Sequence, residues 1–329
     1  MDTMTRLDGA TEPREAGRRA GDRPARRFRL RAWATIAAFL LPALVLFCLL
    51  VVAPILLALY ASLFKWNGFG VLPTDFIGLD NFTRLFEDEI FLGDLWRGLL
   101  LIVLSVGVQL PLALGIALLL NQPMRGRAVY RLLFFAPYVV SEVIAAVLFT
   151  MVFSPEQGLA NRILTAIGLE GLTSTWLADP STVMYTLFIV MTWKYFGFYM
   201  IIFLAGRQAI PSEVTEAAAI DGANTWQIFR HVTLPLLGPT IRIGVFLSVI
   251  GTIQLFDLVW VLTGGGPIHT SETLAVTMFQ YGFARYQVGY ASAISVVMFI
   301  ISLVFALGYQ RWVMRRDIEG AITGMKDHR

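Results

Sequence analysis

Charged residues, cysteine and histidine are all scarce in this sequence. Only 15% of its 329 residues are charged, against about 25% in a typical soluble domain, whereas 57% are hydrophobic. This balance predicts a chain that is solvated by lipid. The single cysteine, Cys48, excludes an intrachain disulfide and a cysteine metal cluster, and the three scattered histidines do not indicate a metal site.

The sequence also lacks the motifs of a nucleotide-using enzyme. A P-loop needs Gly-Lys followed by Ser or Thr, so that backbone amides and the lysine surround the phosphates. The three lysines, Lys65, Lys194 and Lys326, follow Phe, Trp and Met instead. A nucleophile elbow, a His-Glu-x-x-His pair and a Gly-x-Gly-x-x-Gly fingerprint are absent as well. We therefore expect a chain that is not an enzyme and binds no cofactor of its own.

Six long apolar runs are present, and each is long enough to cross a bilayer as a helix of about 20 residues. Their continuity argues against the alternating strands of a membrane barrel. The sequence thus predicts an all-α membrane protein, with a six-span domain over 32–313, a disordered basic leader over 1–31 and a tail over 314–329. The runs lie near 33–63, 97–121, 129–153, 182–205, 237–262 and 287–312.

Lysine and arginine placement predicts the orientation. The segments on the side of the N-terminus hold nineteen of the 26 Lys and Arg residues, and the loops on the opposite side hold four. Because basic loops stay in the cytoplasm, both termini are expected there. The opposite side carries an acidic first loop, 64–96.

The polar segment 206–235, between the fourth and fifth runs, predicts two short helices. Ser212 is a suitable N-cap for the first helix. Gly222 offers a turn at positive φ. Asn224, with a glutamine three residues later, predicts a capping box for the second helix, and Pro235 is expected to end it. The residues alone leave two interpretations open, a ridge that docks into a partner protein and an ordinary hairpin that closes the bundle.

Polar side chains within the spans are candidates for a substrate path, because they are costly in lipid and usually face a cavity. Gln254, Asp257 and Trp260 recur at intervals of three, which on one helix places them near a common face. A carboxylate beside an aromatic ring suits sugars, whose hydroxyls need acceptors and whose C–H faces stack on rings. Alternatively, Asp257 pairs with a cation such as Lys194 or lies near the outer interface.

Two further polar residues within the spans are Gln109 and Glu142. Glu142 is expected to be structural or to face another subunit, with Tyr138 and Ser141 as its local hydrogen-bonding partners.

The segment 206–235 resembles the EAA loop of binding-protein-dependent ABC permeases. Further resemblance lies in 76–82, in 158–161 and in 263–267 with the threonines that follow. Together these segments resemble the sugar-permease branch, specifically its maltose-type first half, and imply the six-span fold of a type I (MetI-like) ABC importer. The matching residues of the loop are Glu216, Ala217, Ala218, Asp221, Gly222, Ala223, Phe229, Leu234 and Pro235.

The resemblance implies a transport subunit of a bacterial plasma membrane, which pairs with a second permease and imports a sugar by alternating access. Two ATPase subunits, which use ATP and Mg, would grip the EAA loop, and an extracytoplasmic solute-binding protein would deliver a disaccharide or small oligosaccharide. A polyol derivative such as glycerol phosphate stays open as substrate. Membrane lipid is an expected partner and nucleic acid is not. The alternative is an ion-coupled secondary transporter, which would favour inverted repeats, and no clear internal repeat is visible.

Overall fold

The computed structural model describes residues 23–314 of the chain, with side chains from residue 35 onward. Most of the predicted leader, residues 1–22, and of the predicted tail, 315–329, lie outside the described residues. Helix α1 (Arg23–Phe47) begins well before the predicted start of the membrane domain at residue 32. Arg, Ala and Leu dominate this helix and are good helix formers. Pro24 stands in the first turn, where proline is tolerated, whereas Pro42 lies inside the helix.

The chain divides into two units at Leu56 and Leu57. The first unit contains α1, a π-helical turn at Cys48–Val52 and the start of α2 (Ala53–Ala61). The helical stretch Thr35–Ala61 is apolar all round and none of its most apolar window is buried within the chain. A helix that is hydrophobic on every face suits lipid or a partner subunit, which is how a peripheral membrane span is expected to look.

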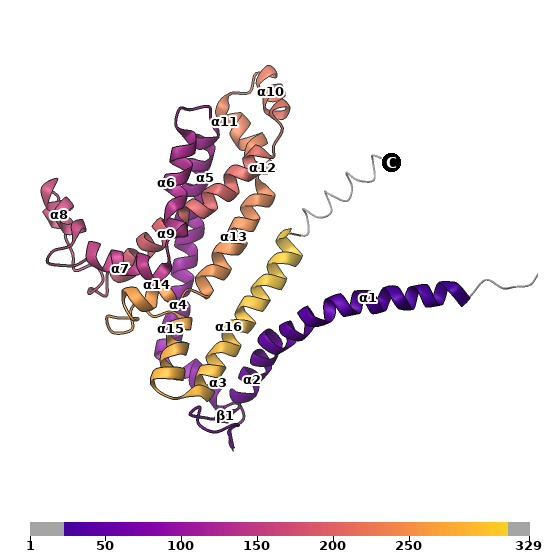
Figure 1. Ribbon diagram of the computed structural model, residues 1–329. Helices are drawn as coiled ribbons and strands as arrows, with labels where there is room; N and C mark the ends of the chain where they lie inside the picture. Colours follow the sequence, from indigo (N-terminus) through magenta and orange to yellow (C-terminus); the bar gives the residue numbers. More distant parts are fainter. Residues whose placement is uncertain (1–22, 315–329) are drawn as a thin grey trace, which may run out of the picture. The chain divides into compact units, whose positions relative to one another are not determined.

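The second unit, from Leu57 onward, is built almost wholly of helices (Figure 1). Beyond α2 its elements are β1 (Phe64–Lys65), β2 (Asp75–Phe76), α3 (Asp80–Glu87), α4 (Glu89–Leu104), α5 (Leu110–Asn121), α6 (Arg127–Val139), α7 (Glu142–Val152), α8 (Leu159–Ala166), α9 (Val183–Gln208), α10 (Ser212–Ile220), α11 (Thr225–Ile228), α12 (Leu234–Leu236), α13 (Gly238–Ile253), α14 (Asp257–Leu262), α15 (Leu274–Phe279) and α16 (Val288–Tyr309). Short π-helical turns at 105–109, 229–233, 280–284 and 310–314 and a 3₁₀ turn at 170–172 join some of them.

Four helical stretches are long and apolar enough to cross a membrane singly, and two bent pairs bring the number to six if each pair is one span. The single stretches are Thr35–Ala61, Glu89–Asn121, Val183–Gln208 and Val288–Met314. The second span begins at Glu89, not at the predicted residue 97. The sequence predicts a loop for the acidic residues there, but buried Asp94 forms an ion pair with Arg97 one turn along the helix.

The third predicted span, 129–153, is not one straight helix. Helices α6 and α7 meet at 98° around Val140 and Ser141, whose backbones are extended. Lys194 from α9 donates hydrogen bonds to the carbonyl oxygens of Pro137 (3.2 Å), Tyr138 (2.7 Å) and Val140, so it satisfies the acceptors left at the end of α6.

The fifth predicted span, 237–262, is also interrupted. The helical stretch Thr225–Leu236 meets α13 at 64°. Helix α13 then ends at Ile253, and Phe256 (φ −126°, ψ −67°) separates it from α14. Gln254 and Asp257 flank this break, but single polar residues do not by themselves end a helix, so tertiary packing decides where the break falls.

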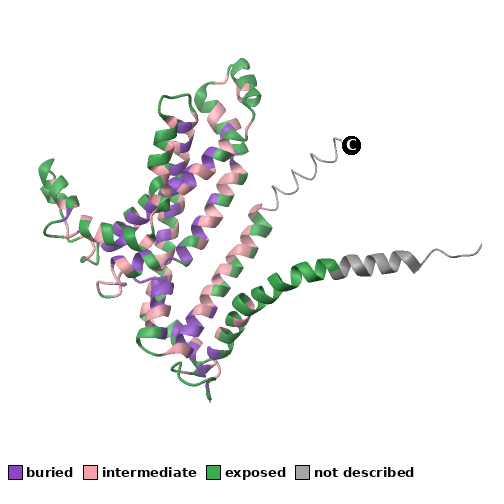
Figure 2. Cartoon of the chain, viewed as in Figure 1, coloured by how far each residue is buried: buried purple, intermediate pink, exposed green. Residues whose placement is uncertain are grey.

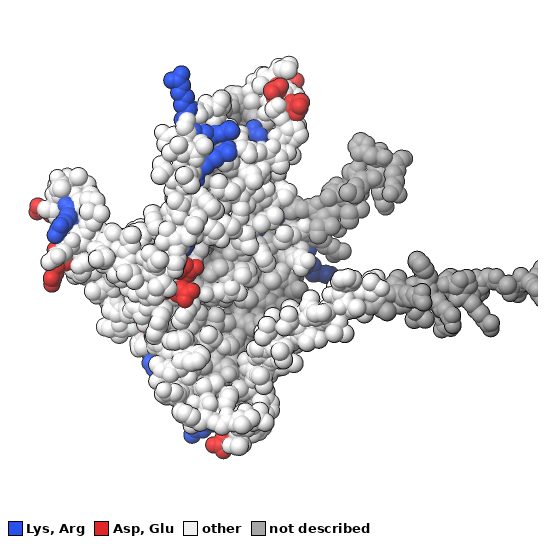
Figure 3. All heavy atoms as spheres, in the orientation of Figure 1, with Lys and Arg blue, Asp and Glu red and all other residues white. Residues whose placement is uncertain are grey.

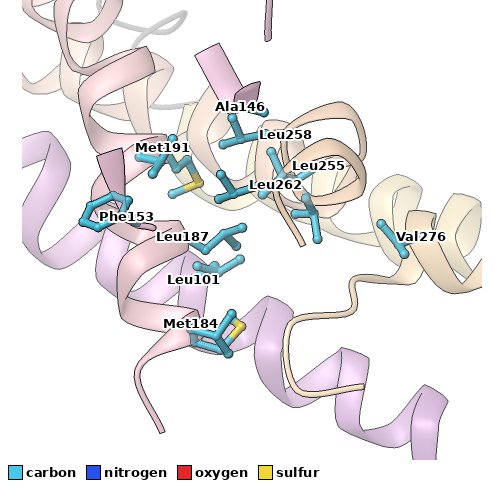
Figure 4. Packing of buried hydrophobic residues seen from close by; sticks show 13 residues of the cluster. Leu101, Ala146, Phe153, Met184, Leu187, Met191, Leu255, Leu258, Leu262 and Val276 are labelled. Carbon is cyan, nitrogen blue, oxygen red and sulfur yellow. The ribbon is translucent and has the colours of Figure 1, made fainter. Parts of the chain in front are cut away.

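Buried side chains gather in the interior of the second unit (Figure 2). One cluster joins α4, α7, α9 and α14, and its leucine and methionine side chains interdigitate in Figure 4. A second cluster joins α5, α9 and α13. At Gly197 a Cβ would meet the carbonyl oxygen of Phe134 at 1.9 Å, so glycine is required where α9 crosses α6. The long helix α9 therefore organises both clusters.

A small hairpin closes the end of the unit that lies away from α10 (Figure 1). β1 pairs antiparallel with β2, with Lys65 opposite Asp75. Buried Asn81 on α3 donates its side-chain amide to the carbonyl oxygens of Ser62 (2.8 Å) and Phe64 (3.0 Å). These two hydrogen bonds fix the β1–β2 hairpin to the ends of the spans.

Candidate functional site

The segment 206–235 forms the helical hairpin that its sequence predicts. Helix α10 ends in a Schellman motif, in which the amide of Ala223 donates to Ala218 O and the amide of Gly222 donates to Ala219 O. Gly222 has φ +87°, as the turn requires. The predicted glycine turn is confirmed.

The caps of the hairpin are partly as predicted. Asn224 and Gln227 form a full capping box, with N···O distances of 2.9 and 2.8 Å. The predicted Ser212 cap is wrong, because Pro211 occupies the N-cap position and Ser212 is already helical. Pro235 does not end the second helix either. The π-helical turn at 229–233 precedes it, and the backbone stays helical to Leu236.

The hairpin exposes large apolar side chains that nothing in the described chain covers. Ile220 is 86% exposed, Trp226 63% and Val214 43%. Acidic side chains gather beside them at the tip that carries α10, and arginine side chains lie near the α5–α6 end of the same unit (Figure 3). A ridge with apolar and acidic groups at its tip has the chemistry of a docking surface.

The structure brings all nine residues of the predicted loop into this hairpin and its continuation. Glu216, Ala217, Asp221, Gly222 and Pro235 are exposed, whereas Ala218, Ala223, Phe229 and Leu234 are half-buried. The exposed members lie mainly at the tip.

A polar cluster lies between α9, α13 and the π-helical turn of the second span. Ser105 donates its hydroxyl to the Gln109 side-chain oxygen and lies 2.7 Å from the Ser248 hydroxyl. The side-chain amide of Gln109 donates to Met191 O at 3.4 Å. A cavity of about 90 Å³ adjoins the cluster, with Tyr195 also in its wall. Single π-helical turns inside α-helices frequently occur at functional sites.

Glu142 is bound across the helices and not by its local neighbours. Tyr195 of α9 donates its hydroxyl to the Glu142 carboxylate at 2.5 Å, in place of the predicted Tyr138 and Ser141. Lys194, beside it, binds the carbonyl oxygens at the end of α6 and is 3% exposed. Lys194 therefore binds backbone carbonyl oxygens instead of Asp257, the partner that the sequence left open.

The three residues predicted to line a substrate path are all exposed, but they do not share one helix. Gln254 caps the end of α13, and Asp257 and Trp260 stand on α14 after the break. The Trp260 ring lies 4.9 Å from that of Phe279 and 6.0 Å from that of Phe256. The predicted common face of a continuous helix is wrong, although all three side chains remain open to a partner or a path.

Sequence reasoning missed most of the polar cluster. Its members lie four residues apart on the helices, as the pairs Ser105–Gln109, Tyr195–Tyr199 and Ser248–Thr252. Recurrence of polar residues at this interval within an apolar run is a detectable signal, because it places both on one helix face.

A second polar cluster stands at the end of the unit that carries β1 and β2, where the second and the last spans begin. The Asp88 carboxylate caps α4 through Ile90 N (2.9 Å) and accepts hydrogen bonds from the hydroxyls of Tyr290 (2.7 Å) and Tyr281 (3.1 Å). Burial acts to raise the pKa of Asp88, but these hydrogen bonds outweigh it and hold that pKa below its usual value. Arg84 stacks on Tyr290 at 4.3 Å.

Within residues 23–314, no group of three or more His, Cys, Asp or Glu side chains is placed to hold a metal ion. The clusters described above consist of hydroxyls, amides and isolated charges. Their chemistry is that of hydrogen bonding and docking.

Comparison with known proteins agrees with this arrangement. The family described as "Binding-protein-dependent transport system inner membrane component" matches residues 109–316. A probable ABC transporter permease of Pyrococcus horikoshii is 37% identical over 84% of this chain and 94% of its own. A lactose transport system permease of Rhizobium radiobacter is 34% identical over 85% of this chain and 93% of its own.

The fold is also similar to a solved structure. One chain in the crystal structure of a bacterial alginate ABC transporter, in complex with an alginate pentasaccharide-bound periplasmic protein, superposes with a TM-score of 0.77. It is 25% identical, and the similarity covers 89% of this chain and 98% of that one.

The apolar helices and the exposed hairpin define a multi-pass membrane transport component with a type I ABC importer fold. The chain belongs to the family of binding-protein-dependent transport system inner membrane components. It is thus a permease subunit of an ABC transporter, and members of this kind are transport components and not enzymes.

Proposed function

We propose that this chain is the first permease half of an importer for a disaccharide or small oligosaccharide, driven by separate ATPase subunits. The observation that carries the proposal is the hairpin at 206–235. Its apolar residues Ile220 and Trp226 are exposed, and Glu216 and Asp221 stand beside them. Burying such side chains in a groove is favourable by about 1.5–3 kcal/mol for each one fully covered.

In this proposal the hairpin is the coupling element. The two ATPase subunits bind ATP and Mg, and their closure moves the docked hairpin. The hairpin continues through the helical turn before Leu237 into α13, so a push on it reaches the polar cluster around Ser248. Population shift requires that the hairpin contacts the ATPase differently in the two states.

The substrate passes between this subunit and a second permease. The cavity beside Gln109 measures about 90 Å³, whereas ligand sites usually measure about 300–1,000 Å³. This cavity is thus too small to be a sugar site by itself, and a second subunit completes the site. Trp260, Asp257 and Gln254 are exposed and available to that path, which supports the sugar assignment together with the lactose-transporting relative.

The hairpin faces the cytoplasm in this proposal, and both termini lie on the same side. The bias of arginine toward the loops at that end supports the orientation. The opposite end, with β1, β2 and α3, then faces a solute-binding protein. The similar alginate transporter was solved in complex with a periplasmic protein, which supports a partner of this kind.

A single-cysteine crosslinking experiment tests the coupling assignment. Cys48 is the only cysteine, so Cys48→Ser gives a clean background for Ile220→Cys. We expect a short bifunctional crosslinker to join Ile220→Cys to an ATPase subunit in membranes. Val71→Cys, 94% exposed at the other end, is the matched control and should join only the solute-binding protein. Crosslinking of the ATPase at position 71, or at neither position, would refute the orientation.

Function is tested with Glu216→Lys and Gly222→Asp in proteoliposomes that hold the full complex. A Cβ at Gly222 meets nothing within 4 Å. The Gly222→Asp substitution therefore acts through backbone strain at positive φ, which costs about 1–2 kcal/mol. Both variants should insert normally yet lose ATP-driven uptake from a panel of labelled disaccharides. Glu156→Lys, an exposed charge reversal outside the hairpin, should retain ATPase binding. Normal uptake by both hairpin variants would remove the coupling role.

The substrate path is tested in the same assay. Asp257→Ala and Trp260→Ala should raise the sugar concentration needed for half-maximal uptake while the complex still assembles. If neither variant changes that concentration, these residues do not contact the sugar.

A further inference from the structure

Two adjoining cavities lie at the end of the second unit that carries β1 and α3. One measures about 610 Å³ and the other about 400 Å³. They share Asn67, Phe69 and Tyr286, and the rings of the last two stack at 5.7 Å. The two cavities differ in chemistry, which makes their junction informative.

The larger cavity has polar and charged side chains among its wall residues, and these carry an excess of positive charge. Lys65 and Arg84 line it, together with one carboxylate, Asp75. Gln287 also lines it, and the side-chain oxygen of Gln287 is buried without a hydrogen-bond partner. An unpaired buried acceptor is destabilising, so a hydrogen-bond donor on a ligand would stabilise this oxygen. The cavity therefore suits a group that combines negative charge with an N–H or O–H donor.

The smaller cavity is apolar and runs along the first turns of α16. Met278, Phe283 and Val288 line it, and the small residues Ala291 and Ser292 leave its volume open. Another wall residue, Ser295, directs its hydroxyl to Ala291 O and to the sulfur of Met278, so it presents little polarity to the cavity. Such a space beside an apolar span suits a hydrocarbon chain.

The surroundings place both cavities at a membrane–water boundary. Helix α16 begins the last span at Val288. Trp66 and Tyr286 stand at its start, and tryptophan and tyrosine concentrate where spans meet water. Phe69 and Phe283 are 68% and 69% exposed in the same region, which is unfavourable in water and favourable among lipids.

We propose that the two cavities together bind one phospholipid whose headgroup carries a hydrogen-bond donor. The phosphate contacts Lys65 and Arg84, the headgroup donor pairs with Gln287, and one acyl chain fills the apolar cavity along α16. A free sugar or a loop of a soluble protein would fill the polar cavity but leave the apolar one empty. The inference needs only the membrane character of the chain, and the proposed orientation assigns the lipid to the outer leaflet.

Native mass spectrometry of the delipidated, assembled complex tests this proposal by titration with defined lipids. Phosphatidylethanolamine and phosphatidylglycerol have headgroup donors, whereas phosphatidylcholine has none. We expect the first two to bind about fivefold or more tightly than phosphatidylcholine, as one recovered hydrogen bond allows. Gln287→Leu should remove this preference and leave phosphatidylcholine binding unchanged.

Further variants distinguish the contributions of the two cavities to lipid binding. Lys65→Gln should weaken all three lipids at least about tenfold, since hydrogen bonds to charged groups are the stronger ones. Ser292→Phe fills the apolar cavity and should weaken all three as well. Arg285→Gln removes an exposed charge that stacks on Tyr281 but lines neither cavity, and should change nothing.

Glycerophosphoethanolamine, the headgroup without acyl chains, serves as the last probe. We expect it not to compete with the lipid at a hundredfold excess. Effective competition would assign the polar cavity to a water-soluble ligand and overturn the proposal. Equal binding of all three lipids to wild type and to Gln287→Leu would overturn it independently.

Discussion

Replacing Lys194 by methionine should loosen the bend between α6 and α7. The ammonium group is almost fully buried and donates to three carbonyl oxygens at the end of α6. Methionine keeps an unbranched stem similar to that of lysine but leaves the three acceptors without donors, at about 1–3 kcal/mol each. The substitution also removes the cost of burying the ammonium charge, which is several kcal/mol and offsets part of this loss of stability. We expect a net loss of about 2–4 kcal/mol, which at about 2 °C per kcal/mol lowers the Tm by roughly 4–8 °C.

The measurement is thermal unfolding of the assembled complex in detergent, compared with Arg125→Met. This control removes an exposed basic side chain that lines neither cavity and should stay within about 0.5 kcal/mol of wild type. A second readout is the distance distribution between spin labels at exposed positions 133 and 163, on either side of the bend. It should broaden only in Lys194→Met. An unchanged Tm and an unchanged distribution would refute the idea that Lys194 holds the bend.

Three further predictions concern single residues. Gly197→Ala should lower the Tm, because its Cβ would lie 1.9 Å from Phe134 O and overpacking costs about 1–3 kcal/mol, whereas Gly251→Ala, with nothing within 4 Å, should be neutral or stabilising. Asp88→Asn should lower the Tm at pH 7. Because the pKa of Asp88 is held below its usual 3.8, the stabilisation is present above that value and fades as pH falls through the folded pKa. Variant and wild type should therefore converge in a pH series below about 4, and a constant difference would contradict this account. Gly222→Ala should speed proteolytic cleavage of the hairpin without changing the Tm of the spans, since φ +87° strains alanine only locally; an unaltered cleavage rate would show that the turn tolerates a side chain.

The sequence by itself determined the features that depend on composition and on local contacts. Long apolar runs specify membrane helices because the bilayer leaves the backbone few other ways to satisfy its polar groups. The glycine turn at Gly222 and the capping box at Asn224 follow from atoms a few residues apart, so they were predictable. The family also was readable, because the hairpin at 206–235 carries several residue types at fixed offsets.

Only the tertiary structure decided where the helices break and which polar groups meet. Lys194 finds its carbonyl partners more than fifty residues away in the chain. Glu142 is bound by Tyr195 instead of its neighbours, and the helix through Gln254 stops although its composition would let it continue. Local propensity cannot specify these features, because a polar group in an apolar interior takes whichever partner the packing of other helices brings within hydrogen-bond distance.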